Sequence, residues 1–269
     1  MVLPRPRTSD GAAALGAIAA RPSAALLAFD FDGTLAPIVP DPRDARPHPR
    51  ALAVLRALAP RVAGVAVITG RPAETAVEYG GLDGVPGIVV LGHYGLERWE
   101  DGSLTTPGAV PGLEDARAAL PGLLADLGPL GEGVHVEDKG KAVAVHTRRA
   151  ARPAEALEAL REPLRLLAER AGLAVEPGRL VIELRPPGMD KGAALTSLAD
   201  RVRPGALLYA GDDLGDLPAF AAVRELRGRG VPGVTVCSGS AEEPRLAGQA
   251  DLVVDGPEGV ALLLEGLLP

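Results

Sequence analysis

The stretch Ala24-Ala25-Leu26-Leu27-Ala28-Phe29-Asp30-Phe31-Asp32-Gly33-Thr34 joins an apolar run to two carboxylates spaced two positions apart. The apolar run has the length and composition of a buried strand. Alternate residues of an extended chain point the same way, so Asp30 and Asp32 are expected to face one volume beyond the carboxyl end of that strand. Two like charges in an apolar neighbourhood favour a compensating cation, and Mg²⁺ prefers oxygen ligands. The alternative for this stretch alone is an Asp-Gly turn with both carboxylates solvated.

Composition narrows the class of protein. The chain has 269 residues, of which 47% are hydrophobic, and it carries a net charge of -7. An acidic chain is a poor match for nucleic acid, because phosphate-backbone binding depends on clustered Lys and Arg. The sequence has no apolar run of the roughly 20 residues that a membrane span needs, and its N-terminus does not match a signal peptide. The single Cys237 lies in an apolar run, which is typical of a buried strand residue. We expect a soluble cytoplasmic protein with no nucleic-acid or membrane partner.

The order of apolar runs and helical segments predicts an α/β fold. Strand-like runs alternate with Ala- and Leu-rich segments of helical period, which is typical of a doubly wound, mainly parallel sheet with helices on both faces. The predicted strands are residues 26–31, 62–69, 87–91, 206–210, 233–237 and 251–254, and the predicted helices include 49–58, 72–79, 192–201 and 217–227.

The middle of the chain has a different pattern and predicts an inserted α+β module. Two amphipathic segments, 113–127 and 153–171, alternate with short strand-like runs at 134–136, 142–147, 173–177 and 180–184. Gly- and Pro-rich stretches at 106–112 and 186–188 flank the module and are interpreted as hinges or linkers. The expected organisation is a tail or covering segment at 1–22, a catalytic core at 23–109 and 187–269, and an inserted cap at 110–186.

Three more predicted element ends carry polar residues that suit a phosphate and a metal. Thr69-Gly70-Arg71-Pro72 follows a strand, and its hydroxyl and backbone N–H groups can meet an anion. Asp190 is a candidate N-cap, which places Lys191 in the first turn of the next helix. The acidic stretch Gly211-Asp212-Asp213-Leu214-Gly215-Asp216 follows another strand. Each motif also has an ordinary interpretation: the first as a common turn, the second as a solvated lysine, and the third as a solvated acidic loop.

The ordered set of these motifs resembles the haloacid-dehalogenase-like phosphatases. Within the α/β-capped branch, the chain is similar to the trehalose-6-phosphate phosphatase family. The segments that carry this second resemblance are Leu91-Gly92-His93-Tyr94-Gly95-Leu96-Glu97, Val136-Glu137-Asp138-Lys139-Gly140, and Glu183-Leu184-Arg185-Pro186 leading into Asp190-Lys191-Gly192.

The resemblance implies a reaction and a set of catalytic residues. It implies Mg²⁺-dependent hydrolysis of trehalose 6-phosphate to trehalose and phosphate, the final step of trehalose biosynthesis, through an aspartyl-phosphate. Asp30 would be the nucleophile and Asp32 the general acid and base, while Thr69, Gly70 and Lys191 would hold the phosphoryl group. The implied metal site comprises Asp30, Asp32 through its backbone carbonyl, Asp212, Asp213 and Asp216.

The resemblance also implies a phosphorylated disaccharide as the small-molecule substrate, and we expect a monomer. Carboxylates and ammonium groups can select sugar hydroxyls through charge-assisted hydrogen bonds. The predicted substrate-binding residues are Arg71, His93, Tyr94, Gly95, Glu97, Glu137, Lys139 and Glu183. For His93, a structural role in loop packing is an equal alternative.

Two departures from the family pattern and two alternative functions stay open at this point. The chain has Gly215-Asp216-Leu217 where the family usually has Thr-Asp-Glu, and His146-Thr147-Arg148 where it usually has His-Tyr-Arg. One alternative is an enzyme acting on another sugar phosphate, such as sucrose phosphate or mannosyl phosphoglycerate, or a phosphomutase. The other is a non-catalytic sugar-phosphate sensor on the same fold.

Overall fold

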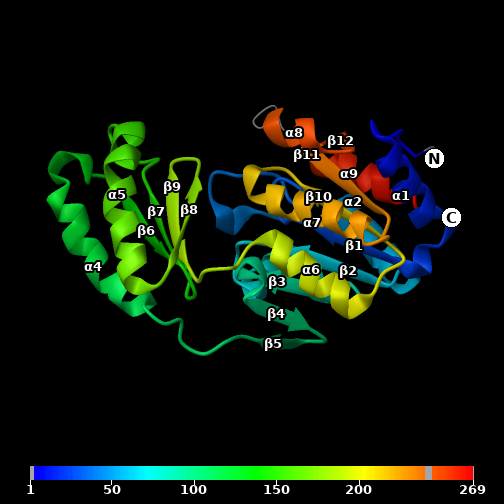
Figure 1. The fold of residues 1–269 in the computed structure, drawn as a ribbon, viewed down its shortest axis with the longest axis horizontal. Helices are drawn as coiled ribbons and strands as arrows, with labels where there is room; N and C mark the ends of the chain where they lie inside the picture. The colour runs from blue at the N-terminus through cyan, green and yellow to red at the C-terminus, as the bar shows by residue number, and fades with distance from the viewer. Residues whose placement is uncertain (1–2, 240–243, 269) are drawn as a thin grey trace. The chain divides into compact units, whose positions relative to one another are not determined.

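The computed structural model describes residues 3–239 and 244–268, which form two compact units (Figure 1). The first unit consists of Met1–Thr106 and Asp190–Pro269, and the second, Pro107–Met189, is inserted between its two segments. Each unit has a sheet and a hydrophobic core of its own.

The first unit contains an eight-stranded sheet in the order β12-β11-β10-β1-β2-β3-β4-β5. The six strands from β12 to β3 are parallel, which confirms the predicted doubly wound class. The strand bounds are β1 (Ala25–Phe29), β2 (Gly64–Ile68), β3 (Ile88–Gly92), β4 (Glu97–Glu100), β5 (Ser103–Thr105), β10 (Ala206–Gly211), β11 (Gly233–Gly239) and β12 (Leu252–Asp255).

Helices cover both faces of this sheet, so its central strands are apolar on both sides. Leu27 and Phe29 of β1 pack into one core, whereas Leu26 and Ala28 pack into the other, because successive side chains of a strand point to opposite faces. Helices α1 (Ser9–Ala20), α2 (Pro49–Leu58), α3 (Ala73–Gly80) and α9 (Gly256–Glu265) contribute to the first core, and α6 (Lys191–Val202), α7 (Leu217–Gly228) and α8 (Pro244–Gln249) to the second.

The strand order reverses direction between β1 and β10. The chain proceeds from β1 to β2 and β3 on one side, and later enters β10 on the other side of β1. Ligands of open α/β sheets bind beyond the carboxyl ends of the strands at such a reversal. Asp30 follows β1, Thr69 follows β2 and Asp212 follows β10, so these polar residues reach the same edge of the sheet.

The second unit contains a four-stranded antiparallel sheet in the order β6-β7-β9-β8. Its elements are α4 (Leu113–Asp126), β6 (His135–Asp138), β7 (Val143–His146), α5 (Pro153–Ala171), β8 (Ala174–Gly178) and β9 (Val181–Arg185). Apolar strand residues such as Val145 and Leu184 pack with Leu120 of α4 and Leu164 of α5. The pattern of polar and apolar residues along these strands leaves the other face of the sheet polar.

Several elements differ from the sequence-based expectations. The predicted strand 26–31 ends at Phe29, because Asp30 and Phe31 turn into the loop that follows β1. The hairpin of β4 and β5 was not predicted, since its strands are short and rich in charged or polar residues. Helices α8 and α9 were also missed. Within the predicted tail or covering segment 1–22, residues 9–20 form helix α1, which packs on β10 and β11. Cys237 lies buried in β11, as expected. None of the helices in the described ranges is long and apolar enough to cross a membrane.

One buried carboxylate joins the N-terminal segment to the sheet. Asp251, just before β12, accepts hydrogen bonds from the Thr8 hydroxyl, the Arg227 guanidinium, and the backbone and hydroxyl of Thr235, the last two at 2.8 Å. Burial alone would raise the pKa of Asp251, but these donors outweigh it and lower the pKa below the ordinary value.

Replacing Asp251 with Asn is therefore expected to destabilise the protein by about 3 kcal/mol at neutral pH, because Arg227 loses its buried partner. A folded-state pKa below the unfolded one gives stability that is present above the unfolded pKa and is lost as pH falls through the folded pKa. The difference between wild type and Asp251→Asn should therefore shrink below about pH 4. Urea unfolding at neutral and acidic pH measures it, with the exposed Asp255→Asn as the matched control. Equal stability of both variants at neutral pH would contradict this role.

Candidate active site

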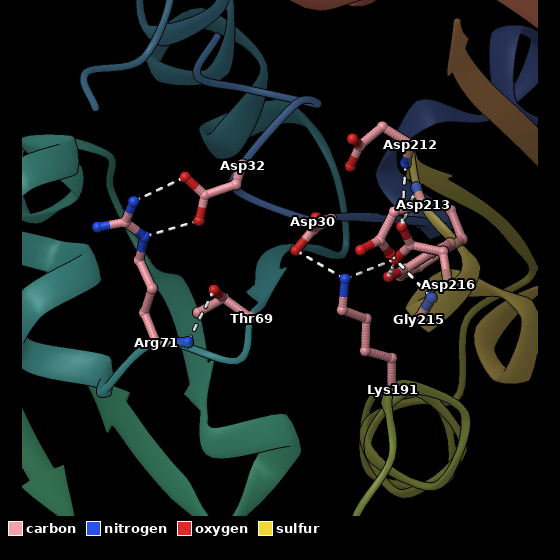
Figure 2. Close-up of polar contacts among 10 residues, drawn as sticks. Asp30, Asp32, Thr69, Arg71, Lys191, Asp212, Asp213, Gly215 and Asp216 are labelled. Atoms are coloured by element: carbon pink, nitrogen blue, oxygen red, sulfur yellow. Dashed lines mark hydrogen bonds and ion pairs between the residues drawn. The ribbon is translucent and has the colours of Figure 1, made fainter. Parts of the chain in front are cut away.

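Asp30 and Lys191 form a buried ion pair at the carboxyl edge of the central strands (Figure 2). The Lys191 Nζ atom lies 2.9 Å from Asp30 Oδ1, and the two residues are only 4% and 5% exposed. A buried charge requires a partner, since taking it out of water costs several kcal/mol. The pair therefore fixes both side chains at the edge where β1 ends.

The local sequence explains how Lys191 reaches this edge. Asp190 is the N-cap of α6, and its carboxylate accepts a hydrogen bond from the backbone N–H of Ala193 at 2.8 Å. Lys191 is thus the first helical residue. Gly192 lets the helix start lie against the start of α7, because a Cβ there would lie 2.4 Å from the carbonyl oxygen of Pro218.

Asp216 organises the acidic loop that follows β10. One of its oxygens accepts hydrogen bonds from Lys191 Nζ at 2.8 Å and from the hydroxyl of Tyr209 at 2.6 Å. The other accepts from the backbone N–H groups of Asp212 and Asp213, at 2.9 and 3.1 Å. A carboxylate has about four acceptor positions, so these donors occupy all of them. The arrangement indicates that Asp216 orients the loop and Lys191.

Three carboxylates lie close together at this edge, and because four donors occupy Asp216, a cation there would be held by Asp30 and Asp212. Oxygen atoms of Asp30, Asp212 and Asp216 lie within 4.8 Å of one another. Burial raises the pKa of Asp30 to about 8 even though the Lys191 ammonium opposes the shift. Burial, and then the charge of Asp30, raises the pKa of Asp212 to about 10. Burial thus disfavours the ionised forms of Asp30 and Asp212, and a cation bound beside them would favour those forms. An all-oxygen donor set of this kind fits a hard divalent ion such as Mg²⁺.

Gly33 allows the loop after β1 to lie against Asp212. Its φ angle is +73°, a conformation that glycine adopts without strain. A Cβ at this position would lie 2.0 Å from a carboxylate oxygen of Asp212. The Gly33 carbonyl accepts a hydrogen bond from the Ser238 hydroxyl of β11 at 2.7 Å. The first motif is thereby fixed to the ends of two other strands.

The turn after β2 carries Thr69, Gly70 and Arg71. The buried Thr69 hydroxyl accepts a hydrogen bond from the backbone N–H of Arg71 at 3.1 Å. The Arg71 guanidinium is directed at Asp32, and both oxygens of Asp32 accept hydrogen bonds from it at 2.7 Å (Figure 2). Asp32 is therefore close to the second motif, and its carboxylate lies outside the group of three carboxylates described above.

The loop after β3 pairs with this turn. The backbone N–H of Tyr94 donates to the Thr69 carbonyl, and that of His93 donates to the Arg71 carbonyl, both at 2.9 Å. His93 and Tyr94 have positive φ angles of 47° and 58°, which are uncommon for residues with side chains. A Cβ at Gly70 would lie 2.7 Å from the Tyr94 hydroxyl oxygen. The structure thus places the Tyr94 hydroxyl beside the phosphate-binding candidate Gly70.

The remaining candidates of this loop face the interior of the first unit. His93 and Glu97 are buried, with His93 Nε2 4.0 Å from Glu97 Oε2. The same oxygen of Glu97 accepts a hydrogen bond at 2.9 Å from the backbone N–H of Ala73, the first residue of α3. Gly95 packs against Ala194 of α6. This geometry favours a structural role for Glu97 at the start of α3.

The polar face of the second unit carries the three other sugar-binding candidates. Glu137 and Glu183 both pair with Ala144 of β7, so their side chains share one face of the sheet. Lys139 follows Glu137 by two positions, and the alternation of side chains along a strand puts it on the same face. Lys139 Nζ lies 2.6 Å from Glu183 Oε2, and Glu137 contacts His146 Nε2 at 2.9 Å. The other oxygen of the buried Glu183, Oε1, has no hydrogen-bond partner among the described residues.

Two residues depart from the sequence-based picture of the acidic loop. Asp213 caps the turn Leu214–Asp216 by accepting a hydrogen bond from the backbone N–H of Gly215 at 2.9 Å, and its carboxylate is not in the group of three. Tyr209, which the sequence analysis did not select, donates its hydroxyl to Asp216 from within β10. The signal was a single tyrosine inside the apolar run Leu207-Leu208-Tyr209-Ala210.

Comparisons with known proteins agree with this fold. Two solved structures share the fold. A haloacid dehalogenase-like hydrolase from Bacteroides thetaiotaomicron has 16% sequence identity and a TM-score of 0.64, and the match covers 90% of this chain and 99% of that one. The trehalose-6-phosphate phosphatase C-terminal domain of C. albicans has 22% sequence identity and a TM-score of 0.78, and the match covers 99% of both chains. The architecture is therefore that of the haloacid-dehalogenase-like proteins.

The sequence comparison narrows this class to a family. The family model for trehalose-phosphatase matches residues 28–256. A trehalose-phosphate phosphatase of Mycobacterium avium (strain 104) is 39% identical over 252 residues, which are 89% of this chain and 61% of that protein. The chain belongs to the trehalose-phosphatase family. It spans about three fifths of the length of the curated relatives it matches.

Proposed function

We propose that this protein is a Mg²⁺-dependent phosphatase that hydrolyses trehalose 6-phosphate to trehalose and phosphate through an aspartyl-phosphate. The observation that carries the proposal is the buried Asp30–Lys191 pair beside Asp212, at the strand reversal of a chain that belongs to the trehalose-phosphatase family. The relatives with this name support the substrate.

Asp30 is the proposed nucleophile. Its carboxylate attacks phosphorus, the bond from phosphorus to the sugar oxygen breaks, and the phosphoryl group is held on Asp30 until water releases it as phosphate. Splitting one difficult displacement into two steps is the general advantage of covalent catalysis. The Lys191 ammonium at 2.9 Å favours the ionised form that attacks, and it orients that form.

Asp32 is the proposed general acid and base. It gives a proton to the departing sugar oxygen, and in the second step it takes a proton from the attacking water. Such transfers contribute typically about 10²- to 10⁴-fold to the rate. Asp32 lies two residues after Asp30 in the same loop, with a side chain that is 40% exposed.

Asp30, Asp212 and the backbone carbonyl of Asp32 would hold Mg²⁺, with Asp213 and Asp216 orienting the loop behind them. When bound, the ion supplies positive charge between the carboxylate and the phosphoryl group. This assignment is supported by the raised pKa values of Asp30 and Asp212, which burial causes and a cation would relieve.

Thr69, Gly70 and Lys191 are proposed to hold the phosphoryl oxygens. The Thr69 hydroxyl, the backbone N–H of Gly70 and the Lys191 ammonium offer hydrogen bonds and charge that complement an anion. The close approach of Tyr94 to Gly70 suggests its hydroxyl as an additional donor.

The polar face of the inserted unit is proposed to recognise the sugar. Glu183 supports this assignment because a buried carboxylate oxygen without a protein donor is ready to accept a sugar hydroxyl. Lys139 and Glu137 lie on the same face and offer further charge-assisted hydrogen bonds.

A substrate panel tests the proposed function. Phosphate release should be fastest from trehalose 6-phosphate when it is measured beside sucrose 6-phosphate, glucose 6-phosphate and mannosyl-3-phosphoglycerate, and EDTA should abolish it. Preference for another sugar phosphate would keep the chemistry and overturn the substrate. Failure to hydrolyse any of them, together with binding of a sugar phosphate, would favour a sensor.

Replacing Glu183 with Ala should reduce hydrolysis of trehalose 6-phosphate far more than that of p-nitrophenyl phosphate, because only the first substrate has a sugar to lose contact with. We expect a loss of about 10- to 100-fold in kcat/KM for the sugar phosphate, the effect of removing one charged hydrogen bond of about 1.5–3 kcal/mol. Glu158→Ala, on the exposed side of α5, is the matched control. Equal losses on the two substrates would remove Glu183 from the sugar site.

A further inference from the structure

The side chain of Arg71 holds both oxygens of Asp32. Its Nε atom donates to Asp32 Oδ2 and its Nη2 atom donates to Oδ1, each at 2.7 Å. Figure 2 shows the Asp32 carboxylate turned toward Arg71, while Asp30 is turned toward Lys191. A two-pronged contact of this kind fixes the plane of the carboxylate as well as its distance.

Arg71 is the fixed member of this pair. Its Nη1 atom donates to the carbonyl oxygen of Pro42 at 2.8 Å, and its guanidinium carbon lies 5.3 Å from the centre of the Phe31 ring. The Arg71 side chain is 13% exposed, whereas that of Asp32 is 40% exposed. Asp32 is thus the more accessible member of the pair, and Arg71 is the member with contacts on several sides.

The backbone of Arg71 belongs to the turn proposed to hold the phosphoryl group. Its N–H donates to the Thr69 hydroxyl at 3.1 Å, and its carbonyl accepts from the backbone N–H of His93 at 2.9 Å. One residue thus connects the proposed acid and base to the proposed phosphoryl-binding turn, so the position of Asp32 is set relative to the phosphoryl group.

We infer that Arg71 is a positioning residue for Asp32 and not the sugar contact that the sequence suggested. The inference rests on the proposed function. A guanidinium has five N–H groups on three nitrogen atoms, and contacts to Asp32 and Pro42 within the first unit engage all three nitrogen atoms. Its effect on the reaction is exerted through Asp32.

The two hydrogen bonds from Arg71, which together form a fork, give the Asp32 carboxyl a fixed point about which it can turn. When one carboxyl oxygen turns to the departing sugar oxygen, the other oxygen keeps a hydrogen bond to Arg71. The proton on Asp32 then passes to the oxygen of the phosphorus–oxygen bond that breaks as Asp30 bonds to phosphorus. Lysine at position 71 would keep the positive charge and lose the fork, because an ammonium group does not orient a carboxylate plane.

A double-mutant cycle tests this inference. The variants Arg71→Lys, Arg71→Gln, Asp32→Asn and Arg71→Gln/Asp32→Asn are compared on trehalose 6-phosphate, whose leaving oxygen needs a proton, and on p-nitrophenyl phosphate, whose leaving group needs little protonation. We expect both Arg71 variants to lose about 10²-fold in kcat on the sugar phosphate with KM nearly unchanged, the size of effect that a misplacement of about 1 Å causes. Their loss on the aryl phosphate should be much smaller. The double variant should be no slower than Asp32→Asn alone.

Three other outcomes overturn the inference. A rise in KM for trehalose 6-phosphate with kcat unchanged would make Arg71 a sugar contact. Equal losses on both substrates that add to the loss of Asp32→Asn would make it a support for the phosphoryl-binding turn alone. Full activity of Arg71→Lys would show that the charge suffices without the fork. A folded wild-type protein that hydrolyses no phosphate ester would instead overturn the proposed function and remove the ground for this inference. If the wild type prefers another alkyl phosphate, the same cycle applies to that substrate. Circular dichroism and the thermal midpoint confirm that each variant is folded.

Discussion

The carboxyl edge of the central sheet depends on one buried cation, the ammonium of Lys191, held between Asp30 and Asp216. Taking charged groups out of water is costly at this edge, and hydrogen bonds and ion pairs among Lys191, Asp30 and Asp216 offset that cost. Asp216, which has no exposure to solvent, accepts hydrogen bonds from four donors. Burial tends to lower the pKa of Lys191, but Asp216 and Asp30 outweigh that effect and raise it. The ammonium therefore stays charged. Burial raises the pKa values of Asp30 and Asp212, and a divalent cation beside them would reverse that shift, which fits the edge to such an ion and, with it, to a phosphoryl group.

The rest of the fold concentrates polar chemistry at this edge. Helices cover both faces of the sheet, so strands β1, β2, β10 and β11 are buried along most of their length, and their ends are where polar side chains can gather. Glycines at positions 33 and 192 permit close approaches that a side chain would block. The inserted unit has one amphipathic sheet. Its apolar face packs on α4 and α5, and its other face carries Glu137, Lys139 and Glu183. In the proposed function, the first unit supplies the phosphoryl chemistry and the second supplies recognition of the sugar.

The parts of the site that sequence reasoning could predict are those that follow from strand ends. Apolar runs that stop at Asp30, Thr69 and Asp212 indicated both the sheet and the edge where its ligands would bind, and Asp190 indicated the helix start that carries Lys191. Contacts between residues distant in sequence could not be predicted in this way. In the sequence, Tyr209 is indistinguishable from any other buried strand residue, and only the structure shows that its hydroxyl donates to Asp216. The two hydrogen bonds between Arg71 and Asp32 join motifs 39 positions apart in the sequence. The contacts of Asp251 with Thr8 and Arg227 likewise join residues far apart in the sequence, so its structural role could not be predicted. The β4–β5 hairpin was missed because polar edge strands lack an apolar pattern.

The most direct measurement of the central claim is the chemical identity of the residue that carries the phosphoryl group during turnover. The wild-type protein is mixed with trehalose 6-phosphate and Mg²⁺, quenched within the first turnover, reduced with borohydride and analysed by peptide mass spectrometry. Because borohydride reduces an acyl phosphate to the alcohol, position 30 should be recovered as homoserine, and the same treatment without substrate should leave aspartate there. Phosphate release with aspartate unchanged at position 30, or with the modification at another carboxylate, would contradict the assignment of Asp30 as the nucleophile.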